Sequence, residues 1–135
     1  MLYKIRRQVP AQTTKAMPDW QKLQIAKGTI VQWVIFMPEE CADLLQFRVE
    51  YHGHQLLPYN TDEWMSGFFY PTSIAEKTEI DAAPYELDVY AFNDDDSYEH
   101  EYNIYVNVEP EKPVVFTEET TPSWWDEFKA WLGVE

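Results

Sequence analysis

The side chains that could support metal or acid–base chemistry in this sequence are few and widely spaced. His52 and His54 flank a glycine, His100 stands alone, and Cys41 is the single cysteine. A tetrahedral zinc site needs several such ligands converging, and its cysteines and histidines follow recognisable spacings. Cys41 has no such spacing to the histidines. We therefore expect no metal at these residues and interpret the histidines as exposed turn residues.

An acidic run over residues 93–96, Asn-Asp-Asp-Asp, offers several oxygen ligands, with Glu99 nearby. Calcium prefers such ligands, but an EF-hand loop also needs a glycine at its sixth position and a glutamate at its twelfth. Neither is present. Asn and Asp also satisfy backbone groups in turns. The run is thus either a calcium site or a solvated turn, and the sequence favours the turn.

Motifs for catalysis are missing from the sequence. It has no Gly-rich phosphate loop, no nucleophile elbow, and no Ser or Cys with a base at a family spacing. With 24 Asp and Glu residues, a carboxylate pair at glycosidase separation would arise by chance. We predict that the chain is not an enzyme and needs no cofactor.

Charge is unevenly distributed along the chain. The net charge is −14, yet residues 1–22 carry five Lys and Arg against Asp19, which is +4, and leave −18 on the remainder. An acidic body repels phosphate backbones, so we expect no nucleic-acid partner. Residues 1–21 also lack helical periodicity, which predicts an extended basic arm that could include a short strand at residues 3–9. Its Lys4, Arg6 and Arg7 are candidate partner-binding residues, although the arm could instead lie on its own domain.

The secondary structure predicted around these residues consists of strands. Residues 45–51 and two runs within 85–108 alternate apolar and polar side chains, which is typical of strands with one buried face. We predict that residues 85–108 form one antiparallel hairpin folded over the acidic run. The expected buried residues are Leu45, Phe47, Val49, Leu87, Val89, Ile104 and Val106.

Further strands are indicated between turn signals. Residues 29–37 are apolar on both faces, with Val31 placed beside Trp33. His52-Gly53 predicts a tight turn, and Pro71 interrupts a strand that should lie at a sheet edge. The short, evenly spaced strands predict an all-β fold: an antiparallel β-sandwich, or a jelly-roll-like domain, over residues 22–109.

The C-terminal residues follow a different pattern. Residues 110–121 read as an acidic linker, and residues 122–133 as a short amphipathic helix with Pro122 at its first position. Its apolar stripe consists of Trp124, Trp125, Phe128, Trp131 and Leu132. The stripe could pack on its own sandwich, on a membrane or on another protein. Few basic residues disfavour a membrane, and the tether favours a groove on a partner.

Aromatic residues also gather in the long loop after residue 57. Tyr59, Trp64 and Tyr70 could stack on sugar rings and make the domain a carbohydrate- or ligand-binding module. They could equally seal one end of the core or a subunit contact, which the sequence favours.

Five short elements of turn and strand residues lie within residues 22–108: Lys27-Gly28-Thr29-Ile30, Phe36-Met37-Pro38, Gln55-Leu56-Leu57-Pro58-Tyr59-Asn60, Pro84-Tyr85-Glu86-Leu87 and residues 93–100. In these elements the chain resembles small β-sandwich structural proteins of prokaryotic viruses, of the minor capsid, vertex or decoration type. The chain departs from the pattern at residues 39–42, where a Gly-containing turn is usual.

The resemblance implies a structural protein of a virion, assembled in the host cytoplasm. Its expected partners are other copies of itself and a capsid or assembly protein, contacted through the arm and the C-terminal helix. The alternatives are the carbohydrate-binding module and an acidic protein that sequesters a basic partner.

Overall fold

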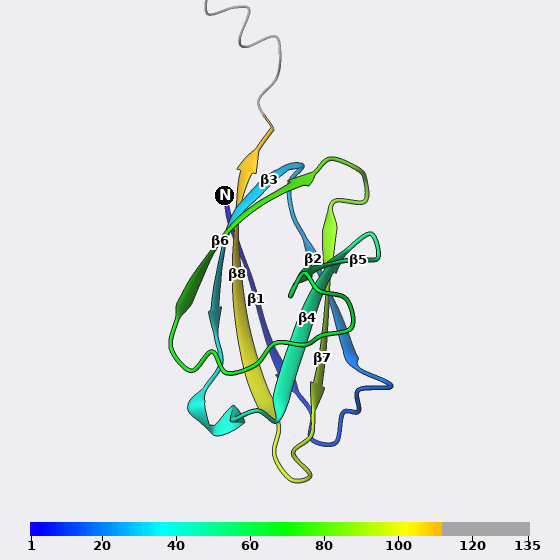
Figure 1. Cartoon of the computed structure of the whole chain (residues 1–135), viewed down its shortest axis with the longest axis vertical. Helices are drawn as coiled ribbons and strands as arrows, with labels where there is room; N and C mark the ends of the chain where they lie inside the picture. Colours follow the sequence, from blue (N-terminus) through cyan, green and yellow to red (C-terminus); the bar gives the residue numbers. More distant parts are fainter. Residues whose placement is uncertain (112–135) are drawn as a thin grey trace, which may run out of the picture.

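Two four-stranded antiparallel sheets pack face to face in the computed structural model, which describes residues 1–111 (Figure 1). Sheet A has the order β1-β8-β3-β6 and sheet B the order β2-β7-β4-β5. The strands of sheet A are β1 (Leu2–Val9), β8 (His100–Pro110), β3 (Gly28–Phe36) and β6 (Thr72–Ile80). Those of sheet B are β2 (Asp19–Gln24), β7 (Glu86–Asn93), β4 (Leu45–Tyr51) and β5 (His54–Leu57). The predicted antiparallel sandwich is confirmed.

The strand pairs are nested along the chain. β1 pairs with β8, β2 with β7, β3 with β6 and β4 with β5, so the chain runs as one long ribbon folded back on itself. Its tip is the predicted turn at His52-Gly53, where both residues have positive φ, 50° and 78°. Glycine adopts that conformation at little cost, which fixes the point of reversal.

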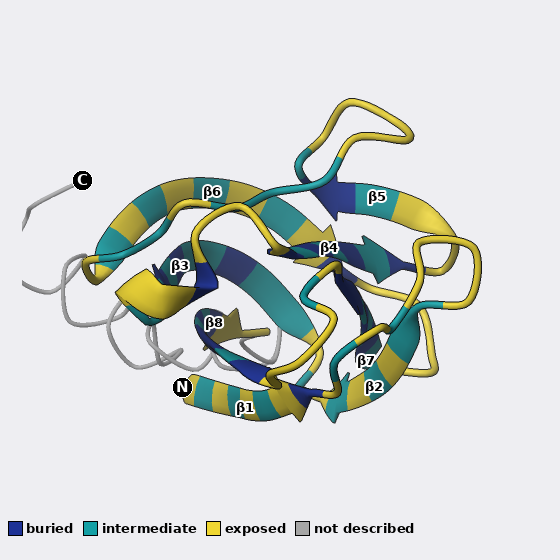
Figure 2. Cartoon of the chain, turned by 90° about the horizontal axis from the view of Figure 1, so that it is seen from below, coloured by how far each residue is buried: buried dark blue, intermediate teal, exposed yellow. Residues whose placement is uncertain are grey.

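The core lies between the two sheets (Figure 2), and all seven residues that the alternation predicted to be buried are buried. Trp33 is its largest fully buried side chain, and its Nε1 donates a hydrogen bond to Glu76 Oε2 at 3.2 Å. A buried indole N–H needs such a partner. β6, which carries Glu76, is an edge strand, as predicted, but Pro71 does not interrupt it, because the strand begins at Thr72. The seven predicted core residues are Leu45, Phe47, Val49, Leu87, Val89, Ile104 and Val106.

The predicted hairpin over residues 85–108 is wrong in its pairing. β7 is hydrogen-bonded to β2 and β4 in sheet B, while β8 is hydrogen-bonded to β1 and β3 in sheet A. The connecting residues 94–99 therefore cross from one sheet to the other, and we call them the β7–β8 arch. Alternation identifies the buried face of each strand. It does not say whether the two faces lie side by side or oppose one another across the core.

The predicted N-terminal arm is also wrong, because residues 2–9 form β1 and residues 19–24 form β2. β1 is paired along its whole length with β8. Arg7 joins the two strands: its Nη2 and Nε donate to the Asp19 carboxylate at 2.8 and 3.2 Å. Tyr3 and Ile5 pack against the core. Burial of these alternate side chains and a full ladder of backbone hydrogen bonds with β8 hold residues 2–9 in sheet A. They are therefore part of the domain and not a separate arm.

The prediction that Val31 and Trp33 share one face of β3 is wrong, because Val31 forms a β-bulge. Ile30 pairs with Val108, but Gln32 pairs with Asn107, so Val31 is one extra residue relative to β8. An extra residue reverses the alternation beyond it. Ile30 and Trp33 consequently share the buried face, whereas Val31 is partly exposed.

The predicted helix over residues 122–133 and all but the first two residues of the predicted linker lie outside the described residues. Within residues 1–111 the one helical element is the single 3₁₀ turn η1 (Glu39–Cys41). No helix in that range has the length and apolar character needed to cross a membrane.

Candidate functional site

Asn93 holds the start of the β7–β8 arch. Its side chain is fully buried, and its Nδ2 donates to the carbonyls of Val9 and Tyr98 at 3.1 and 3.0 Å. Its Oδ1 accepts a hydrogen bond from the Asp95 amide at 3.0 Å. A single amide thereby joins the ends of β1 and β7 to the arch and satisfies groups that would otherwise be buried without partners.

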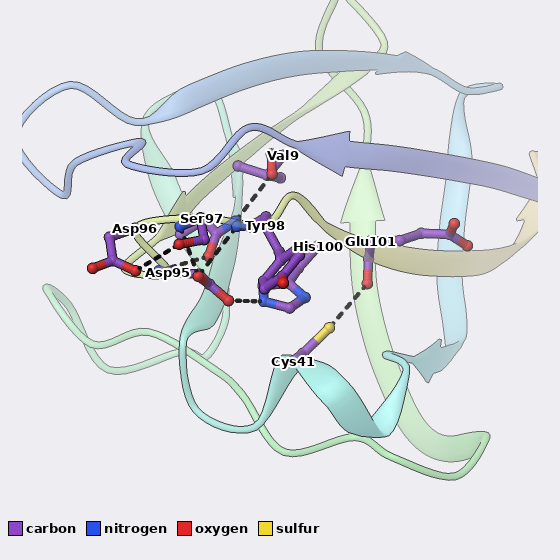
Figure 3. A network of polar contacts seen from close by, with 9 residues as sticks. Val9, Cys41, Asp95, Asp96, Ser97, Tyr98, His100 and Glu101 are labelled. Carbon is purple, nitrogen blue, oxygen red and sulfur yellow. Dashed lines mark hydrogen bonds and ion pairs between the residues drawn. The ribbon is translucent and has the colours of Figure 1, made fainter.

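Asp95 turns its carboxylate into the arch (Figure 3). Oδ1 accepts hydrogen bonds from the amides of Ser97 and Tyr98, and Oδ2 lies 2.8 Å from Nε2 of His100. The amide hydrogen bond from Ser97, followed by the contact with His100, lowers the pKa of Asp95 below its ordinary value. Both oxygens are engaged within the protein, so this carboxylate does not point outward as a ligand.

In these contacts Asn93 and Asp95 bind backbone groups of the arch, as expected for a turn, which the sequence favoured over a calcium site. Within residues 1–111, no three His, Cys, Asp or Glu side chains are grouped as metal ligands. His52 and His54 are exposed, as predicted, but the same prediction was wrong for His100, which is 6% exposed. Its burial follows from its position at the start of β8, facing the arch.

Cys41 lies at the same end of the sandwich as His100 and Asp95 (Figure 3), which are residue types that could form a nucleophilic site. However, the thiol is fully buried and its Sγ contacts the Glu101 carbonyl at 3.6 Å. Burial raises the pKa of Cys41. The thiol is therefore protonated and inaccessible, and the thiolate is the reactive form.

A row of planar side chains crosses the outer face of sheet B, and we call it the stacked row: Trp20, Tyr90, Arg48 and Trp64. Register places Trp20 opposite Tyr90 and Tyr90 opposite Arg48. The rings of Trp20 and Tyr90 are nearly parallel at 9°, with centroids 6.4 Å apart. The Arg48 guanidinium lies 5.3 Å from the Tyr90 centroid and 4.6 Å from that of Trp64.

The stacked row is bound to charged neighbours on the same face. Trp20 Nε1 donates to Asp88 Oδ1 at 2.9 Å. Arg48 Nε lies 2.9 Å from Glu50 Oε2 but lacks the alignment of a hydrogen bond. Most planar faces in the stacked row are thus covered by other members of the row. Trp20, which is 52% exposed, lies at its end. Assigning Trp20 to an extended arm concealed this row, although outward alternation in β4 and β7 pointed to Arg48 and Tyr90.

The three loop aromatics differ in their surroundings. Trp64 packs edge-on against Phe92, with ring centroids 4.8 Å apart, and belongs to the stacked row. Tyr59 and Tyr70 are 83% and 80% exposed. No ring contact within residues 1–111 joins either tyrosine to Trp64.

The basic residues of β1 are divided between two directions. Lys4 and Arg6 point away from the core, while Arg7 faces inward to Asp19. Arg6 forms an ion pair with Glu101 at 2.8 Å, and the Lys4 ammonium lies 5.4 Å from the Tyr105 ring centroid. Two of the three predicted partner-binding cations therefore lie on the outer face of sheet A.

That outer face has an apolar hollow of about 370 Å³, lined by Leu2, Gln32, Val34, Tyr105 and Asn107. We call it the sheet-A groove. A second hollow, of about 550 Å³, lies where β8 ends. Its charged lining is mostly acidic, with two lysines, Lys27 and Lys77.

Comparison of the chain with protein-family models, with curated proteins and with solved structures gave no match. The resemblance of residues 22–108 to viral structural proteins accordingly stays a prediction, and any function must be argued from these surfaces.

Proposed function

We propose that this chain is a non-enzymatic structural protein of a larger assembly, of the minor capsid, vertex or decoration type in a virus particle. The observation that carries the proposal is the nested pairing of the eight strands, β1–β8, β2–β7, β3–β6 and β4–β5. A ribbon paired in this way and rolled into two four-stranded sheets is the jelly-roll arrangement, which is frequent in viral capsid domains.

Fold alone does not assign a function, so the surfaces must support the proposal. The polar clusters within residues 1–111 are occupied by internal contacts at the arch and along the stacked row. The open surfaces include the sheet-A groove, with Leu2 65% exposed on its rim, and the exposed side chains Met17, Tyr59, Tyr70 and Tyr98. Exposed aromatic and apolar side chains are typical of protein interfaces.

The partners under this proposal are other copies of the chain and a capsid or assembly protein, and its location is the virion, assembled in the host cytoplasm. Contact through an N-terminal arm is not part of this proposal, because residues 2–9 form the strand β1. The C-terminal residues 122–133, with their five large apolar side chains, remain the proposed means of reaching a neighbour.

Mass measurement by light scattering on the full chain tests the proposal. A defined ring, such as a trimer or pentamer, or association with particles in a cryo-EM map of the source material, supports it. A protein that stays at single-chain mass and is absent from particles overturns it.

A carbohydrate-binding module is the second candidate, because the Tyr59 and Tyr70 rings are free to stack on sugars. Glycan-array binding by the full chain that is lost on Tyr59→Ala and Tyr70→Ala would support this candidate.

A further inference from the structure

The sheet-A groove has an apolar floor without a partner among residues 1–111. Val34 and Tyr105 are cross-strand neighbours in its floor, and Lys4, the β1 neighbour of Tyr105, lies beside it. The next row comprises Leu2, Asn107 and Gln32. β6 adds small outward side chains at Ser73 and Ala75, opposite Val34 and Gln32. The result is a shallow trough between larger side chains, of a shape that accepts the ridge of an amphipathic segment.

The charge beside the groove differs in sign from the charge of the body. Residues 112–135 carry two lysines against five acidic residues, a net of −3, which leaves −11 for residues 1–111. Against that acidic background β1 carries Lys4, Arg6 and Arg7 and no acidic residue. Lys4 and Arg6 lie along the β1 side of the groove. Arg6 is also paired with Glu101 of β8, and Arg7 with Asp19, so Lys4 is the cation of β1 without an ion pair among residues 1–111. An apolar segment flanked by carboxylates therefore matches the charge of this side of the sandwich.

The chain itself contains such a segment. Residues 122–133 place Trp124, Phe128, Trp131 and Leu132 at helical spacing, with Asp126 and Glu127 between them. Residues 112–121 separate the segment from the described domain, and ten extended residues span at most about 35 Å. A linker of that length allows the segment to dock on an adjacent copy.

The end of β8 leads the chain out of sheet A. Glu111 is bound to the turn before β3, where its amide donates to the Lys27 carbonyl at 3.2 Å and its carboxylate lies 2.9 Å from Lys27 Nζ. The end of β8 and the N-terminus lie at the same end of the molecule (Figure 1). The groove and the point where the C-terminal residues leave the domain are thus close on one sheet. Each copy carries both a segment that could dock, the donor, and a groove that could receive one, the acceptor.

We propose that residues 122–133 of one copy dock into the sheet-A groove of a neighbouring copy, with the tryptophans over Leu2, Val34 and Tyr105 and the acidic residues beside Lys4 and Arg6. This inference rests on the proposed assembly function and names its acceptor. A donor and an acceptor at different places make a head-to-tail contact, which closes into a ring or extends the assembly.

Three full-length variants test the docking. Val34→Asp places a charge in the groove floor, Leu2→Asp does so on the exposed rim of an edge strand, and Trp124→Ala with Trp131→Ala removes the anchors. Gln24→Asp on the outer face of sheet B is the matched control. We expect the groove and tryptophan variants to associate at least about tenfold more weakly than wild type, since buried tryptophans carry much of the affinity at interfaces. The control should associate like wild type.

Mixing tests whether the groove of one chain accepts the segment of another. A groove variant has an intact segment, and the tryptophan variant has an intact groove, so an equal mixture should form two-chain complexes that neither forms alone. Light scattering on the mixture measures this, and wild type should exceed single-chain mass. A mixture that stays at single-chain mass overturns the proposal.

Two further results separate this inference from the proposed function. Circular dichroism first shows that Leu2→Asp and Val34→Asp are folded. If these folded variants assemble like wild type, the groove is not the acceptor, but the proposed assembly function stands. If wild type itself never exceeds single-chain mass and does not enter particles, both proposals fail.

Discussion

His100 and Asp95 meet inside the β7–β8 arch, with Nε2 of His100 2.8 Å from Oδ2 of Asp95. The contact joins the first residue of β8 to a loop residue five positions earlier. The other oxygen of Asp95 accepts the amides of Ser97 and Tyr98. One carboxylate therefore organises the crossing between the two sheets.

Removing this carboxylate should change how stability depends on acid. Hydrogen bonding lowers the folded-state pKa of Asp95, so its ionised form stabilises the fold above the unfolded-state pKa, about 3.9. That contribution is lost as pH falls through the folded-state pKa. We expect the free energy of unfolding to fall more steeply below about pH 4 in wild type than in Asp95→Asn, as measured by urea unfolding across pH.

Asp94→Asn is the control for this change, since Asp94 is an exposed neighbour in the same run. Its acid dependence should match that of wild type. An Asp95→Asn protein with the wild-type acid dependence would show that the carboxylate contributes nothing specific.

Asn93→Ala should destabilise the domain by about 2–3 kcal/mol, because it leaves the carbonyls of Val9 and Tyr98 and the amide of Asp95 without partners. Urea unfolding followed by circular dichroism measures the loss. Asn107→Ala, on the outward face of β8, should change stability by less than about 0.5 kcal/mol. Equal losses in the two variants would contradict the role of Asn93 as the anchor of the arch.

Gly28→Ala should destabilise the pairing of β3 with the end of β8. A Cβ at residue 28 would collide with the Glu109 carbonyl oxygen and lie 2.9 Å from the Pro110 Cα, both of them backbone atoms. Overpacking of this kind costs about 1–3 kcal/mol. A lower melting temperature is expected, whereas Thr29→Ser next to it should be close to wild type. A fully stable Gly28→Ala would mean that the two strands separate there without cost.

Arg48→Met keeps the aliphatic stem but removes the guanidinium between Tyr90 and Trp64. Two cation–π contacts at partly exposed sites amount to about 1–2 kcal/mol, so a loss of that size is expected on thermal unfolding. Arg48→Lys should recover only part of it, because an ammonium lacks the planar fork. Full recovery by lysine would show that charge alone, rather than stacking, stabilises the row.

Much of the fold could be predicted because inward alternation is a local property. The spacing of Leu45, Phe47, Val49 and Tyr51 determines the buried face of β4, and Gly53 allows the positive φ of its turn. Pro71 correctly marked β6 as an edge. Each of these inferences needs only the geometry of neighbouring residues.

The candidate surfaces could not be predicted in the same way, since they join residues far apart in the chain. Trp20, Arg48, Trp64 and Tyr90 form one row only through the register of β2, β7 and β4. Likewise the sheet-A groove combines β1, β3 and β8. Assigning residues 1–21 to an arm hid the contribution of β1 to the groove and that of Trp20, in β2, to the stacked row.

Alternation along each strand is enough to show which side chains leave water: Leu87 and Ile104 are buried because each lies on the apolar face of an alternating strand. That these residues belong to different sheets follows from contacts between strands far apart in the chain. A side-by-side hairpin and a crossing between facing sheets bury the same side chains, so the hydrophobic effect favours both. The choice between them was made by long-range backbone pairing of β8 with β1 and β3, and of β7 with β2 and β4.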